Sequence, residues 1–131
     1  MTVKLDAIGI VVSDMAAAMA FYRRLGLEFV MGDENETHTE ANGPGDLRIM
    51  FDTEESVQSF SEWHRPTGSH RVALAFLCEN PQEVDRMYSD LTTSGGRPHL
   101  DPFDAFWGQR YATVLDADGN AVDLFASLPT D

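Results

Sequence analysis

Residues 5–15 have the sequence Leu5-Asp6-Ala7-Ile8-Gly9-Ile10-Val11-Val12-Ser13-Asp14-Met15, in which an apolar run ends at residues that can cap a helix. The run is short and rich in β-branched residues, which is typical of a buried strand. Ser13 or Asp14 can supply the helix cap. Apolar side chains then recur at spacings of three and four, as on the buried face of a helix: Met15, Ala18, Met19, Tyr22 and Leu25.

The same plan returns 66 residues later. Residues 72–77 form a second apolar run, and Asn80-Pro81-Gln82-Glu83 combines a cap, a proline at the first helical position and an acidic third residue. A shift by this offset pairs Ala7 with Ala73, Ile8 with Leu74, Asp14 with Asn80, Tyr22 with Tyr88 and Leu25 with Leu91. Because each helix is followed by further strands, the pattern predicts an α+β fold of paired βαβββ units, with helices near 14–25 and 81–94 outside curved mixed sheets.

Shorter patterns complete each half. Strands are predicted at about 27–30, 38–41 and 47–51 in the first half and at 110–115 and 121–125 in the second, with a short helix within 53–60. Residues 98–108 are rich in proline, aspartate and aromatic residues, and we interpret them as a loop. Residues 116–120, Asp-Ala-Asp-Gly-Asn, begin like a calcium loop. Gly119 at the fourth position and Ser127 at the twelfth favour a hairpin turn instead.

Composition restricts the function classes. The 131 residues include 9 basic and 22 acidic side chains, a net charge of −13, which disfavours nucleic acid and anionic membranes as partners. The negative charge suits a cationic ligand, although a role in keeping the protein soluble also accounts for it. No apolar run is long enough to span a membrane, and the N-terminus does not resemble a signal peptide. Cys78 is the single cysteine, so a cytoplasmic protein without an internal disulfide is expected.

Several segments resemble the vicinal oxygen chelate superfamily, which includes glyoxalase I, extradiol dioxygenases, fosfomycin-resistance enzymes and bleomycin-resistance proteins. The similar segments are residues 5–15, Phe21-Tyr22-Arg23-Arg24-Leu25-Gly26-Leu27, Pro81-Gln82-Glu83-Val84-Asp85 and residues 116–125. The resemblance implies one domain over residues 1–131, built from units at about 1–62 and 69–131, with a cleft between their concave faces. It does not imply one reaction, because this fold carries many.

The resemblance also identifies four positions at which metal-dependent relatives carry ligands. They correspond here to Ala7, Ile49, Ala73 and Asp123. Three of these side chains are apolar, and a register shift that places Arg48 or Met50 at the second position does not restore a hard-metal ligand. The histidines show no His-x-His or His-x3-His spacing, and a chance exposed position is the simpler interpretation of each. No metal and no cofactor are therefore expected.

Residues 101–111 are the segment most suggestive of binding. They contain four aromatic side chains, on a loop that enters a strand. Such a segment either forms the wall of a ligand site or fills a barrel end or dimer interface. On the first interpretation, Arg110 orients a carboxylate or carbonyl, or else pairs with Asp104 or Asp123. The candidate substrate-binding residues are Met50, Trp63, Phe103, Phe106, Trp107, Arg110, Tyr111 and Asp123.

Two function classes remain open from the sequence. The first is a metal-free module that binds a small amphipathic or aromatic molecule, as bleomycin-resistance proteins do. The second is a lyase, isomerase or dioxygenase, either metal-free or with a metal at an unrecognised site. Catalytic residues are not identifiable. A symmetric homodimer is expected, because relatives commonly pair and because exposed sheet edges favour pairing.

Overall fold

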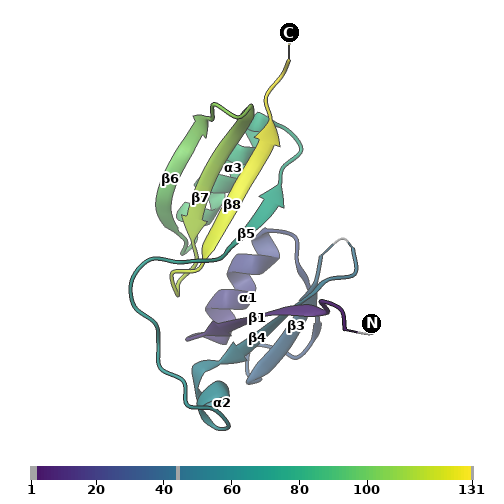
Figure 1. The fold of residues 1–131 in the computed structure, drawn as a ribbon, viewed down its shortest axis with the longest axis vertical. Coiled ribbons are helices and arrows are strands. Elements are labelled where there is room, and N and C mark those ends of the chain that lie inside the picture. Colours follow the sequence, from purple (N-terminus) through teal and green to yellow (C-terminus); the bar gives the residue numbers. More distant parts are fainter. Residues whose placement is uncertain (1–2, 44, 131) are drawn as a thin grey trace. The chain divides into compact units, whose positions relative to one another are not determined.

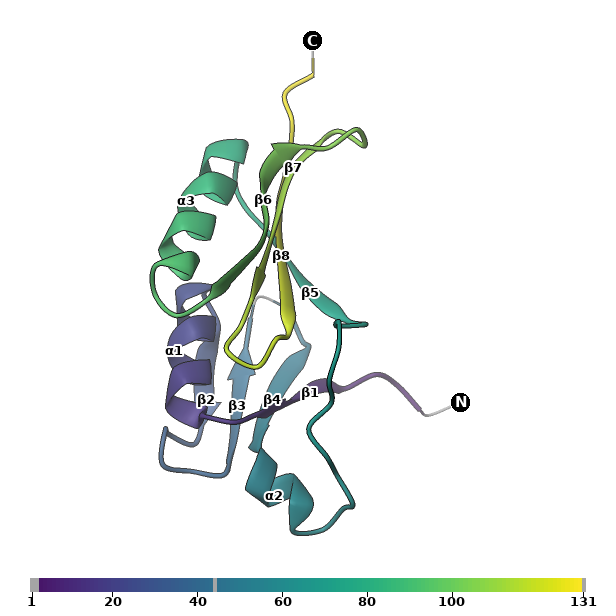
Figure 2. The same cartoon turned by 90° about the vertical axis from the view of Figure 1, so that its left-hand side faces the viewer.

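The computed structural model describes residues 3–43 and 45–130, and the chain divides into two compact units, Met1–Thr67 and Gly68–Asp131. Each unit contains a four-stranded mixed sheet with a helix along one of its faces (Figure 1 and Figure 2). The predicted α+β class with two βαβββ units is confirmed. We call the sheet face opposite the helix the open face of that unit.

Unit 1 contains β1 (Ala7–Val12), α1 (Met15–Arg24), β2 (Glu28–Met31), β3 (His38–Asn42), β4 (Arg48–Thr53) and the short α2 (Glu54–Gln58). The strand order is β1-β4-β3-β2, with β1 parallel to β4 and the other pairs antiparallel. The carboxylate of Asp14 accepts a hydrogen bond from the backbone N–H of Ala17 at 3.1 Å, so Asp14 is the cap of α1.

The core of unit 1 lies between α1 and one face of the sheet. Tyr22 and Phe51 are fully buried, with ring centroids 5.1 Å apart, and Met19 is buried beside them on α1. The hydroxyl of Thr39 donates to the sulfur of Met15 at 3.4 Å, which satisfies a polar group inside the core. Alternate residues of β3 and β4 therefore have their side chains on the open face.

Unit 2 repeats this plan with β5 (Ala73–Leu77), α3 (Pro81–Thr92), β6 (Arg97–Asp104), β7 (Gln109–Leu115) and β8 (Ala121–Ser127). The strand order is β5-β8-β7-β6, with β5 parallel to β8. Asn80 caps α3 by accepting from the backbone N–H of Glu83 at 2.8 Å. No helix within the described part of the chain is both long and apolar enough to cross a membrane.

The prediction of a loop over residues 98–108 was wrong for residues 98–104, because β6 extends from Arg97 to Asp104. Pro98 and Pro102 suggested a loop, since proline cannot donate to a strand ladder. The strand order places β6 at the edge of its sheet, where one side of the strand needs no donors. The pairing of β6 with β7 also shifts register between Pro98 and Leu100 and again before Phe103, which accommodates the irregular sequence.

The turn between β7 and β8 is closed by a buried carboxylate. Asp116 is 2% exposed and accepts hydrogen bonds at 2.9 Å from the backbone N–H groups of Asp118 and Asn120 and from the Asn120 side-chain amide. Gly119 has φ +84°, a conformation that favours glycine. The carboxylate is thus committed to the turn, as the hairpin interpretation requires.

Asp116→Ala is expected to lower the free energy of unfolding by about 2 kcal/mol, because it leaves buried backbone donors without an acceptor. Urea denaturation followed by circular dichroism measures the change. Asp46→Ala removes the same charge from an exposed position in unit 1 and should have little effect. Equal effects of the two substitutions would contradict a structural role for the Asp116 hydrogen bonds.

Candidate functional site

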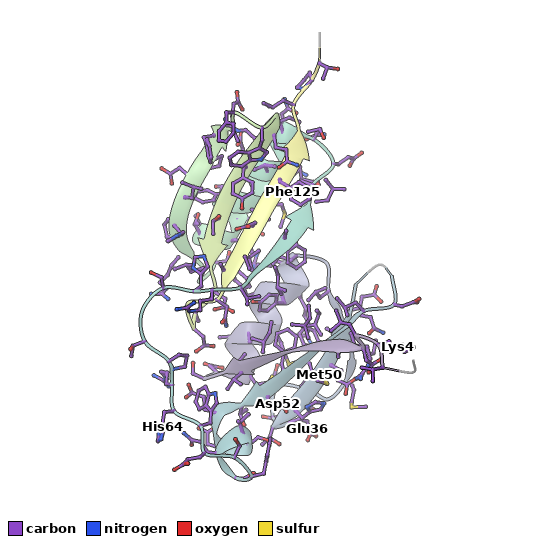
Figure 3. The ribbon with its side chains drawn as sticks, in the orientation of Figure 1. Lys4, Glu36, Met50, Asp52, His64 and Phe125 are labelled. Carbon is purple, nitrogen blue, oxygen red and sulfur yellow. The ribbon has the colours of Figure 1, made fainter. Side chains whose placement is uncertain are left out.

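The open face of unit 2 follows from the alternation of side chains along β7 and β8. Ala112 and Val114 on β7, with Val122 and Leu124 on β8, are fully buried on the side that carries α3. The residues between them therefore have their side chains on the open face. On β7 and β8 these are Tyr111, Thr113, Asp123 and Phe125, and Figure 3 labels Phe125.

Asp123 is the polar centre of this face. Its carboxylate accepts hydrogen bonds from the Tyr111 hydroxyl and, at 2.8 Å, from the Thr113 hydroxyl. Burial and the neighbouring Asp123 carboxylate raise the pKa of Tyr111 to about 12. Tyr111 is therefore a neutral hydrogen-bond donor at physiological pH. A carboxylate has about four acceptor positions, so Asp123 retains the capacity to accept from a further donor.

An aromatic cluster lies next to this carboxylate. Phe103 on β6 is paired with Tyr111, so both rings are on the open face. The ring of Trp107 lies 6.1 Å from Phe103 and 5.3 Å from Tyr111 between centroids, and Phe106 lies 5.0 Å from Trp107, all in edge-to-face geometry. Trp107 is 48% exposed and Phe106 is 97% exposed. Four of the predicted binding residues thus form one continuous aromatic surface.

Arg110 lies elsewhere. Its position between Tyr111 and Gln109 on β7 turns its side chain toward α3, where the guanidinium binds Asp85 at 3.0 Å and Asp104 at 3.1 Å. The alternative of pairing with Asp104 is therefore the one observed, and Asp85 is an additional partner. The structure does not bring Arg110 together with Tyr111 and Asp123.

The two candidate residues from the first half belong to unit 1. Met50 is on the open face of that unit, in β4, and Figure 3 shows it with Asp52 two residues further along the strand. Trp63 lies in the segment between α2 and β5 and is partly exposed.

The open face of unit 1 carries a charged cluster that the sequence analysis missed, formed by Asp6, His38, Glu40, Arg48 and Asp52. His38 contacts Asp52 through Nδ1 at 2.6 Å and Glu40 through Nε2 at 2.9 Å. Arg48 binds Glu40 and, at 2.6 Å, Asp6. The sequence contained a signal for this cluster, because His38 and Glu40 are two residues apart on one strand, and Arg48 and Asp52 are four apart on the next. Even spacings place all four side chains on one face of the sheet.

The charges in this cluster support each other's ionised forms. Hydrogen bonds to Glu40 and Asp52 raise the pKa of His38 above its usual 6.5. Hydrogen bonds from His38 and Arg48 lower the pKa of Glu40. The cluster therefore favours the protonated form of His38 between two carboxylates, and a protonated imidazole in this position is able to deliver a proton.

The register of β4 corrects one assignment made from the sequence. Ile49 is 7% exposed and faces the core, so it is not the counterpart of Asp123. In unit 1, Gly9 of β1 pairs with Met50, and in unit 2, Ala75 of β5 pairs with Asp123. Met50 therefore occupies the equivalent position. A one-residue error in register moves a side chain to the opposite face of a sheet.

The four positions that the resemblance identifies, with Met50 in place of Ile49, do not carry the ligands of a catalytic divalent ion. Ala7 and Ala73 have no lone pair, and Met50 offers a soft thioether, which leaves the Asp123 carboxylate alone. Catalytic zinc sites typically use three protein ligands. Within residues 3–43 and 45–130, no three His, Cys, Asp or Glu side chains are grouped in a way that could hold a metal ion. In the charged cluster, both nitrogens of His38 are already bonded to carboxylates.

Comparisons with known proteins agree with this architecture. A family model described as Glyoxalase/Bleomycin resistance protein/Dioxygenase superfamily matches residues 4–124. No curated protein matches the sequence.

Solved structures share the fold at low sequence identity. A glyoxalase-related enzyme from Fulvimarina pelagi has a TM-score of 0.81 and 18% identity over 95% of this chain and 88% of its own. A glyoxalase/bleomycin resistance protein/dioxygenase family enzyme from Burkholderia phytofirmans has a TM-score of 0.80 and 20% identity over 96% of this chain and 100% of its own. At these identities the likeness concerns the fold alone.

The raised pKa of His38 makes a contribution to stability that depends on pH. The pKa of His38 is higher in the folded protein than in the unfolded chain, where it is near 6.5. Such a group stabilises the folded state fully at a pH below the unfolded-state pKa. The stabilisation is lost as the pH rises through the folded-state pKa. His38→Gln should therefore destabilise the protein more at pH 6 than at pH 9, measured by urea denaturation.

His64→Gln alters an exposed histidine in the segment after α2 and serves as the control. It should leave the pH dependence of stability unchanged. A destabilisation by His38→Gln that is independent of pH would show that the ring acts only through packing. The NMR titration of the His38 ring should give a midpoint above 6.5.

Proposed function

Because the chain belongs to the Glyoxalase/Bleomycin resistance protein/Dioxygenase superfamily, we propose that it binds a small aromatic or amphipathic molecule at the open face of unit 2 without the help of a metal ion. The observation that supports the proposal most directly is the aromatic surface of Phe103, Phe106, Trp107 and Tyr111 next to the Asp123 carboxylate.

The aromatic surface supports the proposal through its exposure. Phe106 and Trp107 leave much of their apolar area in water, although the chain is strongly charged elsewhere. Burying that area under a planar ligand is favourable, and each aromatic pair adds about 0.5–1.5 kcal/mol beyond area burial. Contacts with two or three rings therefore give useful affinity without a metal–ligand bond.

The charge of the site favours a ligand that carries a hydrogen-bond donor or a positive charge. Asp123 is an anionic acceptor bound directly to the Tyr111 hydroxyl, and Tyr111 and Thr113 hold its carboxylate in one orientation. Arg110 is bound to Asp85 and Asp104, so the nearest cation is neutralised by its own carboxylates. The net charge of −13 adds a long-range attraction for cations. An aromatic amine or amidine fits these features better than an aromatic acid.

A lyase or isomerase is the second candidate, and the charged cluster of unit 1 favours it. The contacts of His38 with Glu40 and Asp52 raise its pKa and favour the imidazolium form, which is a proton donor. A substrate identified by turnover would separate the two hypotheses, because His38→Gln should then abolish turnover and leave affinity unchanged. The binding roles of Met50 and Trp63, the homodimer and the cytoplasmic location remain predictions.

Trp107→Ala is expected to weaken binding by more than tenfold, or about 1.4 kcal/mol. A thermal-shift screen of planar aromatic cations, with neutral and anionic analogues of the same ring systems, identifies a ligand for titration by calorimetry. Leu5→Ala removes an exposed apolar side chain in unit 1 and should leave affinity unchanged. If no aromatic compound binds, or if Trp107→Ala retains full affinity, the proposed site is wrong.

Treatment with EDTA followed by dialysis into metal-free buffer should change the affinity for that ligand by less than twofold. The reason is that Ala7, Met50 and Ala73 provide no hard-metal ligand. Elemental analysis of the dialysed protein should find no stoichiometric divalent ion. Binding that requires a restored metal would overturn the metal-free mechanism and leave the aromatic contacts to be tested by Trp107→Ala.

A further inference from the structure

Two histidines of unit 2 meet outside the site described above. His70 precedes β5, and His99 is in β6, and their rings lie 5.4 Å apart between centroids with planes inclined by 75°. We propose that His70 and His99 together bind one divalent transition-metal ion, of which Zn²⁺ is the representative, with water completing the coordination. This site is separate from the four positions used by metal-dependent relatives.

The two rings lie close enough to share one ion once they rotate. A Zn–N bond of about 2.1 Å places the centroid of a coordinating imidazole about 3.2 Å from the ion, and a tetrahedral angle then separates two such centroids by about 5.3 Å. The rings lie 5.4 Å apart in an edge-to-face contact, so both side chains are within reach of a shared ion. Rotation about the side-chain torsions, which both exposed rings can make, turns one nitrogen of each ring toward the ion.

The backbone around His99 presents its ring in a particular way. Pro98 pairs with Val114 and Leu100 pairs with Thr113, so His99 is the extra residue where the register of β6 shifts. A bulge of this kind changes the direction of a side chain and is a common feature next to functional sites. The chain segment before β5 supplies the second ring, so the site joins two elements that are 29 residues apart in the sequence.

The two rings differ from His38 in their partners. His38 is engaged by carboxylates at both nitrogens, whereas neither His70 nor His99 is hydrogen-bonded to an acidic side chain within the described residues. Rings without a carboxylate partner keep their nitrogens available to a metal ion. Arg71 and Arg97 are the nearest basic residues in the sequence, and the Arg97 guanidinium is turned toward Gly119 in the β7–β8 turn.

The donor set predicts the selectivity of this site. Two imidazoles suit Cu²⁺, Ni²⁺ and Zn²⁺ and do not suit Mg²⁺, which prefers oxygen ligands. A site with two protein ligands is expected to release its ion during dialysis, in contrast to a catalytic site with three. It therefore does not conflict with a metal-free protein after dialysis.

Calorimetric titration of the full chain with ZnCl₂ at pH 7.5 tests the proposal. One Zn²⁺ should bind per chain, MgCl₂ should give no comparable signal, and His70→Gln and His99→Gln should each weaken Zn²⁺ binding at least tenfold. His64→Gln and His38→Gln are the matched controls and should leave Zn²⁺ binding unchanged. All four histidines lie outside the buried core, so the variants are expected to fold, and circular dichroism verifies this.

Zn²⁺ affinity should fall by more than tenfold at pH 5.5, because protonated imidazole does not bind metal. The proposal is overturned if wild-type protein binds no Zn²⁺, or if binding survives in the His70→Gln/His99→Gln double variant. The double variant should retain the affinity for aromatic ligands, so failure of this site is distinguishable from failure of the proposed function.

Discussion

One constraint underlies both units: a single helix covers one face of each four-stranded sheet, and side chains alternate between the two faces. The buried face must be largely apolar, and it carries residues such as Ile49 and Phe51 in unit 1 and Val122 and Leu124 in unit 2. Every second residue of a central strand is then placed on the opposite face, whatever its chemistry. The open faces are therefore the part of the fold on which composition is free to vary, and the residues of the proposed site are found there.

The open faces of the two units carry different kinds of side chain. In unit 1 the face carries five charged side chains that neutralise one another through His38 and Arg48. In unit 2 it carries aromatic rings around one carboxylate. The two units share strand order and the parallel pairing of their first and last strands, but the aromatic surface of unit 2 also uses Phe106 and Trp107, which follow β6. This agrees with the general observation that a fold supports many functions through the residues grafted onto it.

Met50 and Asp123 are at equivalent positions of the two units and carry different chemistry. Both are at the middle of the last strand of their unit, opposite Gly9 and Ala75. One side chain is a thioether and the other is a carboxylate held by Tyr111 and Thr113. A carboxylate that receives two hydroxyl donors is oriented for hydrogen bonding, and burial that raises the pKa of Tyr111 to about 12 keeps that donor neutral. Recognition of a polar group on an aromatic ligand is a coherent use of this arrangement.

The sequence by itself determined the two helices, most of the strands, the Asn80 cap and the duplication, because these depend on local periodicity and short-range hydrogen bonds. It limited the first cap to Ser13 or Asp14, and the structure shows that Asp14 accepts from Ala17. It also identified the aromatic residues that gather beside Asp123. It did not determine β6, since two prolines conceal a strand that only its edge position permits. Nor did it place Ile49 in the core, Arg110 beside Asp85, or His38 between two carboxylates. Each of these depends on which residue of a neighbouring strand or helix lies opposite. Strand register and helix packing decide this, and they link residues that are distant in the sequence, so only the tertiary structure sets them.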